Sequence, residues 1–559
     1  MDQAAVPAVF NYTPIPAAVG GYYSQAKQPP SNGMTFQAGQ WIQIPIVTGR
    51  IGQFYDPQRC YLMFQVTMTG TGATNSLMLE RVGGHAFLES VELWLNGQPL
   101  EQIQQYNCLM QLIRDQYYGL GRADVCADVE GCACELQMSW AVSNGGYSCI
   151  VGKTNAQWGV GEITTLNTPG ILSVYTASTD AAAITGCTPQ LLTPATTAPN
   201  AIITGNTGNS TTNTRYFALP ILSGLLGTLA AKAFPALVFA PGSLFWQIKL
   251  AQPAAVGTRI AVAAGTATAQ GFTFVPYTAT DSWQISNFNF VSGAVTLQSG
   301  VAATILSAAA SGQLDLNTKS FTNVFASVAS STSATIIVPL RKLSLNSIFV
   351  TFRDPNRETG TGTAATATVP AAGAAHGGFL SRIAPAGTIS NTFTSQWRFG
   401  NELIREYPYQ QSVEFYVEVL RNLHEWFDKE LNFCAALTPL RFLSPVAAST
   451  LVTSLGDQAY YNPIGGFYAT YCNALPAQSC DKASQLLQQC GFFLALDLDV
   501  FSGSSSTSRS GRNTTGDQIT LVLGGGAAAM FDRTMRADFF GFHDLRVNIQ
   551  SGGVAVPVS

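Results

Sequence analysis

The sequence predicts an all-β protein with a few helices, built from two large β domains. Its 559 residues are too many for one hydrophobic core but suit two sandwich domains of roughly 200–250 residues each. Apolar and polar side chains alternate in many short segments, as half-buried strands require. In addition, a succession of strand, turn, strand and helix occurs twice, at an offset of about 300 residues, which indicates that one fold is used twice.

The strand prediction depends on period-two alternation of apolar residues. After the segment 91–95, Asn96-Gly97 suits a tight hairpin because both residues tolerate positive φ. Many short strands separated by turn residues indicate sandwiches or barrels and not a parallel sheet. The alternating segments are 42–46, 62–68, 91–95, 244–250, 348–352, 492–496 and 519–523.

Three helices are expected, over 107–118, over 412–431 and within 221–233. The second has Ser412 as its N-cap and apolar residues on one face. The first two helices occupy equivalent places, because each follows a short strand and a Gly/Asn turn, at 96–101 and at 400–405. We therefore expect the two halves of the chain to share one architecture.

The composition argues against nucleic-acid binding and for burial in partners. The chain is 47% hydrophobic and only 11% charged, against about 25% charged in typical soluble domains. Its net charge is −4 and it contains no run of Lys or Arg, whereas phosphate binding needs a clustered basic face. A monomer with so few charges would expose much apolar surface, which normally marks contact with other chains.

Several segments lie outside the strand pattern. The N-terminus lacks the layout of a secretory signal and is expected to be an extended arm over 1–35. The apolar stretch 219–250 is interrupted by prolines and predicts a core segment, not a membrane span. Long loops rich in Thr, Ala, Gly, Asn and Ser are expected at one end of the sandwiches, where they would form an outer turret; these loops are 121–214, 359–378 and 502–516.

No catalytic, cofactor-binding or metal-binding residue is assigned, and no cofactor is expected. Asp497 and Asp499 could act in glycoside hydrolysis or bind calcium, but a polar strand face at a domain rim or interface is the favoured interpretation. The histidines at 85, 376, 424 and 543 lack metal-ligand spacing. The cysteines at 126, 132, 134 and 149 are expected to be free thiols, with disulfides or a metal site as alternatives.

Four adjacent pairs of opposite charge lie near expected turns. We expect these pairs to be exposed, where each contributes about 0–1 kcal/mol and matters more for the orientation of partners than for stability. A role at a subunit interface is an alternative for some of them. The pairs are Glu80-Arg81, Arg353-Asp354, Arg357-Glu358 and Asp532-Arg533.

An ordered series of segments resembles the double jelly-roll major capsid proteins of polinton-like and adintovirus-like double-stranded DNA viruses, relatives of adenovirus hexon and the tectivirus coat. The similar segments extend along most of the chain outside the long loops, and the similarity also includes the ending from Phe539 to Ile549. The segments are FQAGQWIQIPI (36–46), FYDPQRCYLMFQV (54–66), FLESVELWLNG (87–97), LEQIQQYN (100–107), LPILSGLLGTL (219–229), SIFVTFRDP (347–355), QWRFG (396–400) and GFFLALDLD (491–499).

The resemblance implies two tandem eight-stranded jelly rolls with long surface loops: a first over 36–300, which carries the 121–214 insertion, and a second over 301–559. It implies a structural, non-enzymatic protein of the virion, assembled inside the host cell as a homotrimer. Such pseudo-hexameric capsomers tile an icosahedral capsid. The implied partners are neighbouring capsomers, penton and minor capsid proteins, with an internal membrane left open.

Two other classes of function remain open at this stage. A secreted or surface-layer adhesion protein would contain repeated sandwich modules of about 100 residues and disulfides. A carbohydrate-active enzyme would carry Asp497 and Asp499 in a cleft with aromatic platforms. The capsid interpretation is favoured because it also accounts for the duplication and the low charge.

Overall fold

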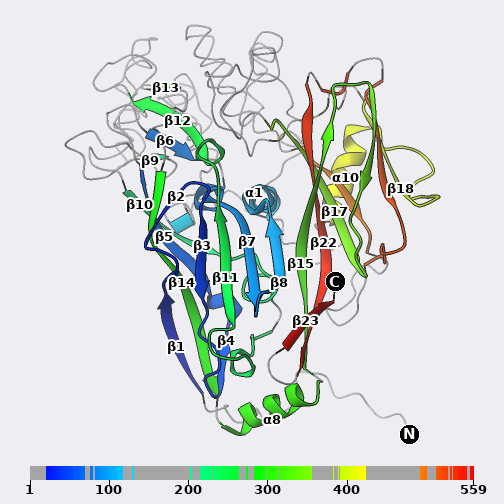
Figure 1. Ribbon diagram of the computed structural model, residues 1–559. Helices are drawn as coiled ribbons and strands as arrows, with labels where there is room; N and C mark the ends of the chain where they lie inside the picture. Colours follow the sequence, from blue (N-terminus) through cyan, green and yellow to red (C-terminus); the bar gives the residue numbers. More distant parts are fainter. Residues whose placement is uncertain are drawn as a thin grey trace, which may run out of the picture.

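The computed structural model shows two β-sandwiches standing side by side (Figure 1). All structural statements concern the described part of the chain, which consists of residues 21–68, 76–79, 82–117, 129–130, 202–203, 214–230, 232–262, 272–274, 283–297, 299–312, 314–355, 382, 385, 388, 391–422, 492–499, 511–526, 529–531, 533–550 and 554–558.

The first sandwich consists of two antiparallel sheets that face each other. One sheet has the order β1 (Gly21–Gln28), β14 (Trp283–Leu297), β5 (Tyr61–Met68) and β10 (Thr214–Pro220), with β2 (Thr35–Gln37) and β4 (Gln53–Tyr55) also paired to β14. The facing sheet has the order β3 (Trp41–Pro45), β11 (Leu244–Leu250), β7 (Leu88–Leu95) and β8 (Gln98–Gln104).

The second sandwich repeats this plan. One sheet has the order β15 (Leu314–Val328), β22 (Met535–Gln550), β17 (Leu345–Arg353) and β20 (Leu494–Asp497), with β23 (Val554–Val558) also paired to β22. The facing sheet has the order β16 (Ser333–Val338), β21 (Ile519–Gly524), β18 (Thr394–Phe399) and β19 (Glu402–Leu403).

The two sandwiches correspond strand by strand. In chain order, β1, β3, β5, β7, β8, β10, β11 and β14 of the first match β15, β16, β17, β18, β19, β20, β21 and β22 of the second, and each takes the same place in its sheet. The turn between β7 and β8 uses positive φ at Asn96 and Gly97, and the turn between β18 and β19 uses it at Gly400. The chain is therefore a double jelly roll, and the duplication predicted from the sequence is confirmed.

The helices agree only in part with the sequence. Helices α1 (Tyr106–Tyr117) and α10 (Ser412–Asn422) begin where predicted, and each follows a short edge strand; 423–431 lies outside the described residues. Helix α8 (Ser299–Ala310), which joins the two jelly rolls (Figure 1), is additional. Among the helices of the described segments, none combines the length and apolar character that crossing a membrane requires.

The prediction of a helix within 221–233 is wrong. Residues 221–230 form turns, in which the Thr228 N–H donates to the Ile221 carbonyl, seven residues back, at 2.8 Å and not to a carbonyl four residues back as in a helix. The Ser223 hydroxyl accepts from the N–H groups of Leu225 and Leu226, both at 3.2 Å. Gly227 also lies so close to the Ile221 carbonyl that an added Cβ would be 2.1 Å from its oxygen.

Part of the expected N-terminal arm belongs to the first jelly roll. Residues Gly21–Gln28 pair along their whole length with β14. Seven of these eight side chains are exposed, which explains why the segment lacks the alternation of a half-buried strand. Residues 1–20 lie outside the described part of the chain.

A small additional sheet lies at one end of the first jelly roll (Figure 1). Its order is β13 (Phe272–Phe274), β12 (Gly257–Val262), β6 (Ser76–Leu79) and β9 (Ile202–Ile203). Strand β9 comes from the 121–214 insertion, so this insertion is attached to the jelly roll at that end. Most of 121–214, and nearly all of 359–378 and 502–516, lie outside the described residues.

Each sandwich is filled by the inward residues of its facing sheets. In β11 every second residue is buried, and Trp246 is only 1% exposed. Aromatic rings pack against one another in the core of the first jelly roll. The Phe64 ring stacks on the Phe288 ring with 5.1 Å between their centroids, and the Phe87 ring contacts the Trp283 ring edge-on with 4.8 Å between their centroids. Burial of each such side chain contributes roughly 1.5–3 kcal/mol relative to exposure.

The second jelly roll buries an ionisable group. The Nε2 atom of His543, on β22, is 2.9 Å from the Thr322 hydroxyl on β15. Burial, together with the positive charge of Lys342, lowers the pKa of His543 to about 3. The native state therefore keeps this imidazole neutral, whereas the unfolded chain takes up a proton near its ordinary pKa of 6.5.

This difference predicts an acid-sensitive component of stability. The folded pKa is depressed, so the contribution is present above pH 6.5 and is lost as the pH falls toward 3. Between about pH 7 and pH 4, the free energy of unfolding should fall by about 3 kcal/mol more in the unsubstituted protein than in His543→Gln. Urea denaturation at a series of pH values measures both losses, and equal losses would contradict the prediction.

Candidate assembly surfaces

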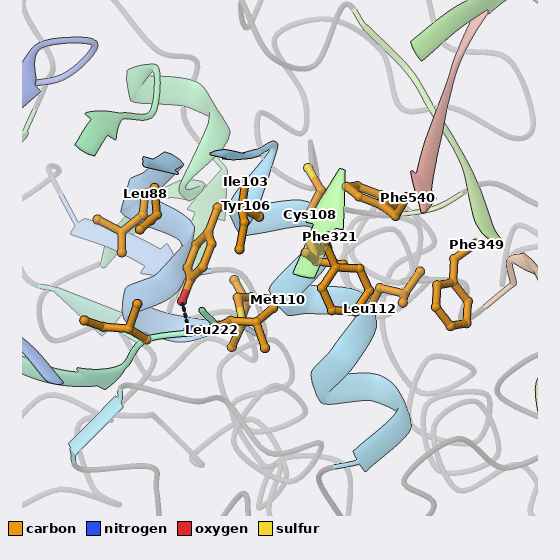
Figure 2. Close-up of a cluster of buried hydrophobic side chains, with 14 of the residues drawn as sticks. Leu88, Ile103, Tyr106, Cys108, Met110, Leu112, Leu222, Phe321, Phe349 and Phe540 are labelled. Atoms are coloured by element: carbon orange, nitrogen blue, oxygen red, sulfur yellow. Dashed lines mark hydrogen bonds between the residues drawn. The ribbon is translucent and has the colours of Figure 1, made fainter. Parts of the chain in front are cut away.

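Helix α1 of the first jelly roll packs on the outer face of a sheet of the second. Figure 2 shows Cys108 of α1 near Phe540, and Leu112 of α1 between Phe321 and Phe349. Cross-strand pairing places Phe349, on β17, opposite Phe540, on β22, so the two rings share the outer face. Strand β8 contacts β15 and β23 next to this cluster. The two jelly rolls thus share one continuous apolar interior.

A buried ion pair lies within this interface. The Arg353 side chain, 1% exposed, donates from Nε to Asp538 Oδ2 at 3.0 Å and from Nη2 to Gln105 Oε1 at 3.1 Å. Its Nη1 also contacts the Cys108 Sγ, and its Nη2 also donates to Asp538 Oδ2. Asp538 accepts a third bond, from Arg536 Nε to Oδ1 at 3.0 Å. Arg353 therefore joins the second jelly roll to the start of α1.

The expectation that the adjacent charge pairs are exposed is wrong for Arg353-Asp354. Arg353 and Asp354 are both 1% exposed and do not form an exposed pair at a turn. Asp354 lies 3.5 Å from Arg533 Nη1. The sequence placed these charges correctly at a strand end, but it could not show that both are buried or that Arg353 contacts the first jelly roll. Residues 80, 81, 357, 358 and 532 lie outside the described segments.

A second buried carboxyl lies on the first jelly roll's side of the same interface. Glu101, on β8, accepts hydrogen bonds from Ser223 Oγ, from Ser320 Oγ on β15 and from Gly224 N, the last at 2.9 Å. Burial raises the pKa of Glu101 above its ordinary value. The Thr318 hydroxyl donates to the Gly224 carbonyl at 2.6 Å. The turn at 221–230 is thereby held against β15.

A cavity of about 330 Å³ lies beside α1, between the jelly rolls. Asp497 and Asp499 line it with Asn346. The Asn346 Nδ2 donates to Asp499 Oδ1 at 2.8 Å, and the Asp499 N–H donates to Asp497 Oδ1 at 3.0 Å. The two aspartates thus lie at an interface between domains, but β20 ends at Asp497 and Asp499 is not part of the expected strand face. The other lining residues include Met110, Ile113, Leu222, Phe321, Phe349 and Phe542.

Of the histidines, the described segments include His85 and His543, and these two lie in different jelly rolls. His85 is buried in the first jelly roll with its Nε2 3.7 Å from Glu130 Oε2, and burial lowers its pKa. His543 lies in the second jelly roll, and 376, 424 and the cysteines at 126, 132, 134 and 149 lie outside the described residues. Cys60 and Cys108 are buried free thiols. Across the segments that the structure describes, no group of three or more His, Cys, Asp or Glu could hold a metal ion.

One apolar surface faces outward on α10. Positions 413, 416, 417 and 420 are spaced at i, i+3, i+4 and i+7, which places them on one side of the helix. Val413 is 64% exposed, and the other three are half-buried. The opposite side, with Phe415 and Val419, is buried in the second jelly roll. Tyr416 also packs against the core, so we call the other three residues, Val413, Val417 and Leu420, the α10 stripe.

Another apolar surface lies on the outer face of the β1–β14–β5–β10 sheet. Tyr61, Met63 and Gln65 of β5 point away from the core and are half-buried. Tyr216 of β10 pairs with Gln65 and is 59% exposed. We call the four residues Tyr61, Met63, Gln65 and Tyr216 the β5 face.

No protein-family model and no curated protein matches the sequence. Solved structures do match. The Faustovirus major capsid protein superposes with a TM-score of 0.50 at 10% identity, covering 98% of this chain and 93% of that chain. The PBCV-1 virus capsid protein gives 0.49 at 9%, covering 98% and 99%, and a Sputnik virophage structure gives 0.49 at 10%, covering 100% and 92%. The fold is that of double jelly-roll major capsid proteins along nearly the whole chain.

The buried ion pair should contribute strongly to stability. Arg353→Met would leave the Asp538 carboxylate buried with only Arg536 beside it, so the free energy of unfolding should fall by about 3 kcal/mol. The matched control is Arg546→Met, which removes the pair with Asp315 and should cost much less, because that pair is exposed to solvent. Urea denaturation compares the two variants, and similar losses would contradict the assigned importance of Arg353.

Gly224 of the first jelly roll packs closely on β15 of the second, so a substitution there tests the interface between the two jelly rolls. An added Cβ would be 2.2 Å from the Lys319 carbonyl oxygen on β15, so Gly224→Ala must push the jelly rolls apart. Overpacking of this kind costs about 1–3 kcal/mol. Gly300→Ala in α8 is the control, because no atom lies within 4 Å of its added Cβ. Thermal denaturation should show a lower midpoint for the first variant only.

Proposed function

We propose that the chain is a major capsid protein, a structural protein of an icosahedral virion. The observation that carries the proposal is the duplication: two jelly rolls with the same strand order, side by side, account for nearly the whole described chain. The fold likeness to the Faustovirus major capsid protein supports it. The secreted adhesion protein is not favoured, because it would consist of repeated modules of about 100 residues.

The proposed working unit is a homotrimer. Three chains with two similar domains each present six similar edges, which suits hexagonal packing into a shell. Obligate subunit interfaces bury roughly 2,000–5,000 Å² and are depleted of charge. The 11% share of charged residues fits a protein whose surface is largely covered by copies of itself.

Further parts of the proposal concern the domains and partners. The first jelly roll is assigned to 36–300, extended by strand β1, and the second to 301–559. Because β9 attaches the 121–214 insertion at one end of the first jelly roll, that end is proposed to carry an outer turret. Neighbouring capsomers, penton and minor capsid proteins are the proposed partners. We assign the chain no catalytic role and no direct contact with the genome.

Absolute mass measurement tests the proposal. Light scattering of the purified chain should give three times 59.3 kDa, and negative-stain images should show a hexagonal outline. A chain that remains monomeric, both alone and when coexpressed with its virus's assembly factors, would contradict the proposal.

A further inference from the structure

The cavity beside α1 is built by both jelly rolls. The first supplies residues of α1 and of the segment 220–229, and the second supplies residues of β15, β17, α10, β20 and β22. Its volume of about 330 Å³ lies at the lower end of the range for sites that bind small molecules, roughly 300–1,000 Å³. A molecule bound here would contact both halves of the chain, so its binding would be coupled to their relative position.

Most of the described lining is apolar. Figure 2 shows four of these residues from the two jelly rolls, Met110, Leu222, Phe321 and Phe349. The Phe321 ring packs against the Phe542 ring with 4.7 Å between their centroids, so a pair of aromatic rings forms part of the wall. These surfaces suit a ligand with an alkyl or aromatic body, because removing its apolar area from water is favourable.

Two buried carboxamides belong to the same lining. Gln116, on α1, is 0% exposed, and within the described part of the chain neither its Nε2 nor its Oε1 has a hydrogen-bond partner. Asn422, on α10, donates from Nδ2 to the Glu418 carbonyl at 2.8 Å, which leaves its Oδ1 unpaired among the described residues. Buried polar atoms are nearly always hydrogen-bonded. These atoms therefore mark the place where the polar group of a ligand would bind.

The polar part of the lining favours a positively charged head group. Asp497 and Asp499 contribute two carboxylates, and none of the lining residues within the described segments is basic. One positive charge adjoins the wall, because the Lys319 Nζ lies 5.1 Å from the centroid of the Phe542 ring, but the two carboxylates outnumber it. An ammonium group has three donors and no acceptor, which matches the unpaired carboxamide oxygens. A carboxylate head group would instead meet charge of its own sign.

We propose that this cavity binds a small amphipathic amine, with its apolar body against the aromatic wall and its ammonium group at Gln116 and Asn422. The inference goes beyond the proposed capsid function and does not depend on it, because the site lies within one chain. The complete lining exists only when the two jelly rolls are in contact. The amine therefore stabilises that arrangement, since a ligand that binds only the native state raises its stability.

Three probes with the same eight-carbon body test the inference on the full-length chain: n-octylamine, n-octanol and octanoate. At pH 7 the amine is protonated and the octanoate is ionised. Isothermal titration calorimetry should show saturable binding of one octylamine per chain, roughly tenfold tighter than that of octanol because its hydrogen bonds are charge-assisted, and no binding of octanoate. The midpoint of thermal denaturation should rise with the octylamine concentration. Absence of saturable octylamine binding, or equal binding of all three probes, would overturn the inference.

Substitutions in α1 distinguish this site from general adsorption of the probe. Gln116→Leu removes the amide at similar size, so the affinity for octylamine should fall by roughly tenfold or more, while the free protein should be no less stable because it loses an unpaired buried group. Ile113→Phe fills part of the cavity and should also abolish binding. Gln111→Leu is the control, since Gln111 is buried in the same helix but does not line the cavity.

Circular dichroism verifies that each variant folds, and the Gln111→Leu variant should bind octylamine as the unsubstituted chain does. If Gln116→Leu does not fold, Ile113→Phe still tests the location of the site. A folded Gln116→Leu or Ile113→Phe variant with unchanged affinity would contradict the proposed site, and so would an equal loss of affinity in Gln111→Leu.

Discussion

The relative position of the two jelly rolls depends on a buried polar contact. Arg353 binds Asp538 within its own domain and Gln105 of the other, and all three side chains are buried. A buried charge is costly unless its hydrogen bonds are satisfied, so few other placements of the domains are compatible with it. Apolar contacts around α1 supply most of the attraction, and this ion pair makes that attraction specific.

Sequence patterns predicted those parts of the fold that depend on local periodicity. Alternation located β5, β11 and β21, and the Asn96-Gly97 turn located the hairpin before α1. The helix expected within 221–233 does not form, because the backbone folds back so that the Thr228 N–H binds the Ile221 carbonyl and Gly227 lies close to it, and periodicity does not register such turns. Helix α8 was missed because its small residues give no clear apolar side.

The contacts between domains could not be predicted in the same way, because they join residues far apart in the chain. Arg353 and Asp538 are separated by 185 positions, and the sequence around either residue does not indicate that the other is its partner. The outer face of β17 combines Phe349 with Ser347, Thr351 and Arg353, so its composition alone does not show that another domain covers it.

In a duplicated fold, the burial of each surface can be compared with that of the equivalent surface in the other half of the chain. An exposed valine on an isolated helix needs no explanation, since many apolar atoms remain exposed in any protein. Val413 is different, because the helix that corresponds to α10 is covered on that side by a second domain of the same chain. The same comparison applies independently to β5 and β17. In two separate pairs of elements the described outer sides thus differ in burial, although the strand order of the two jelly rolls is the same.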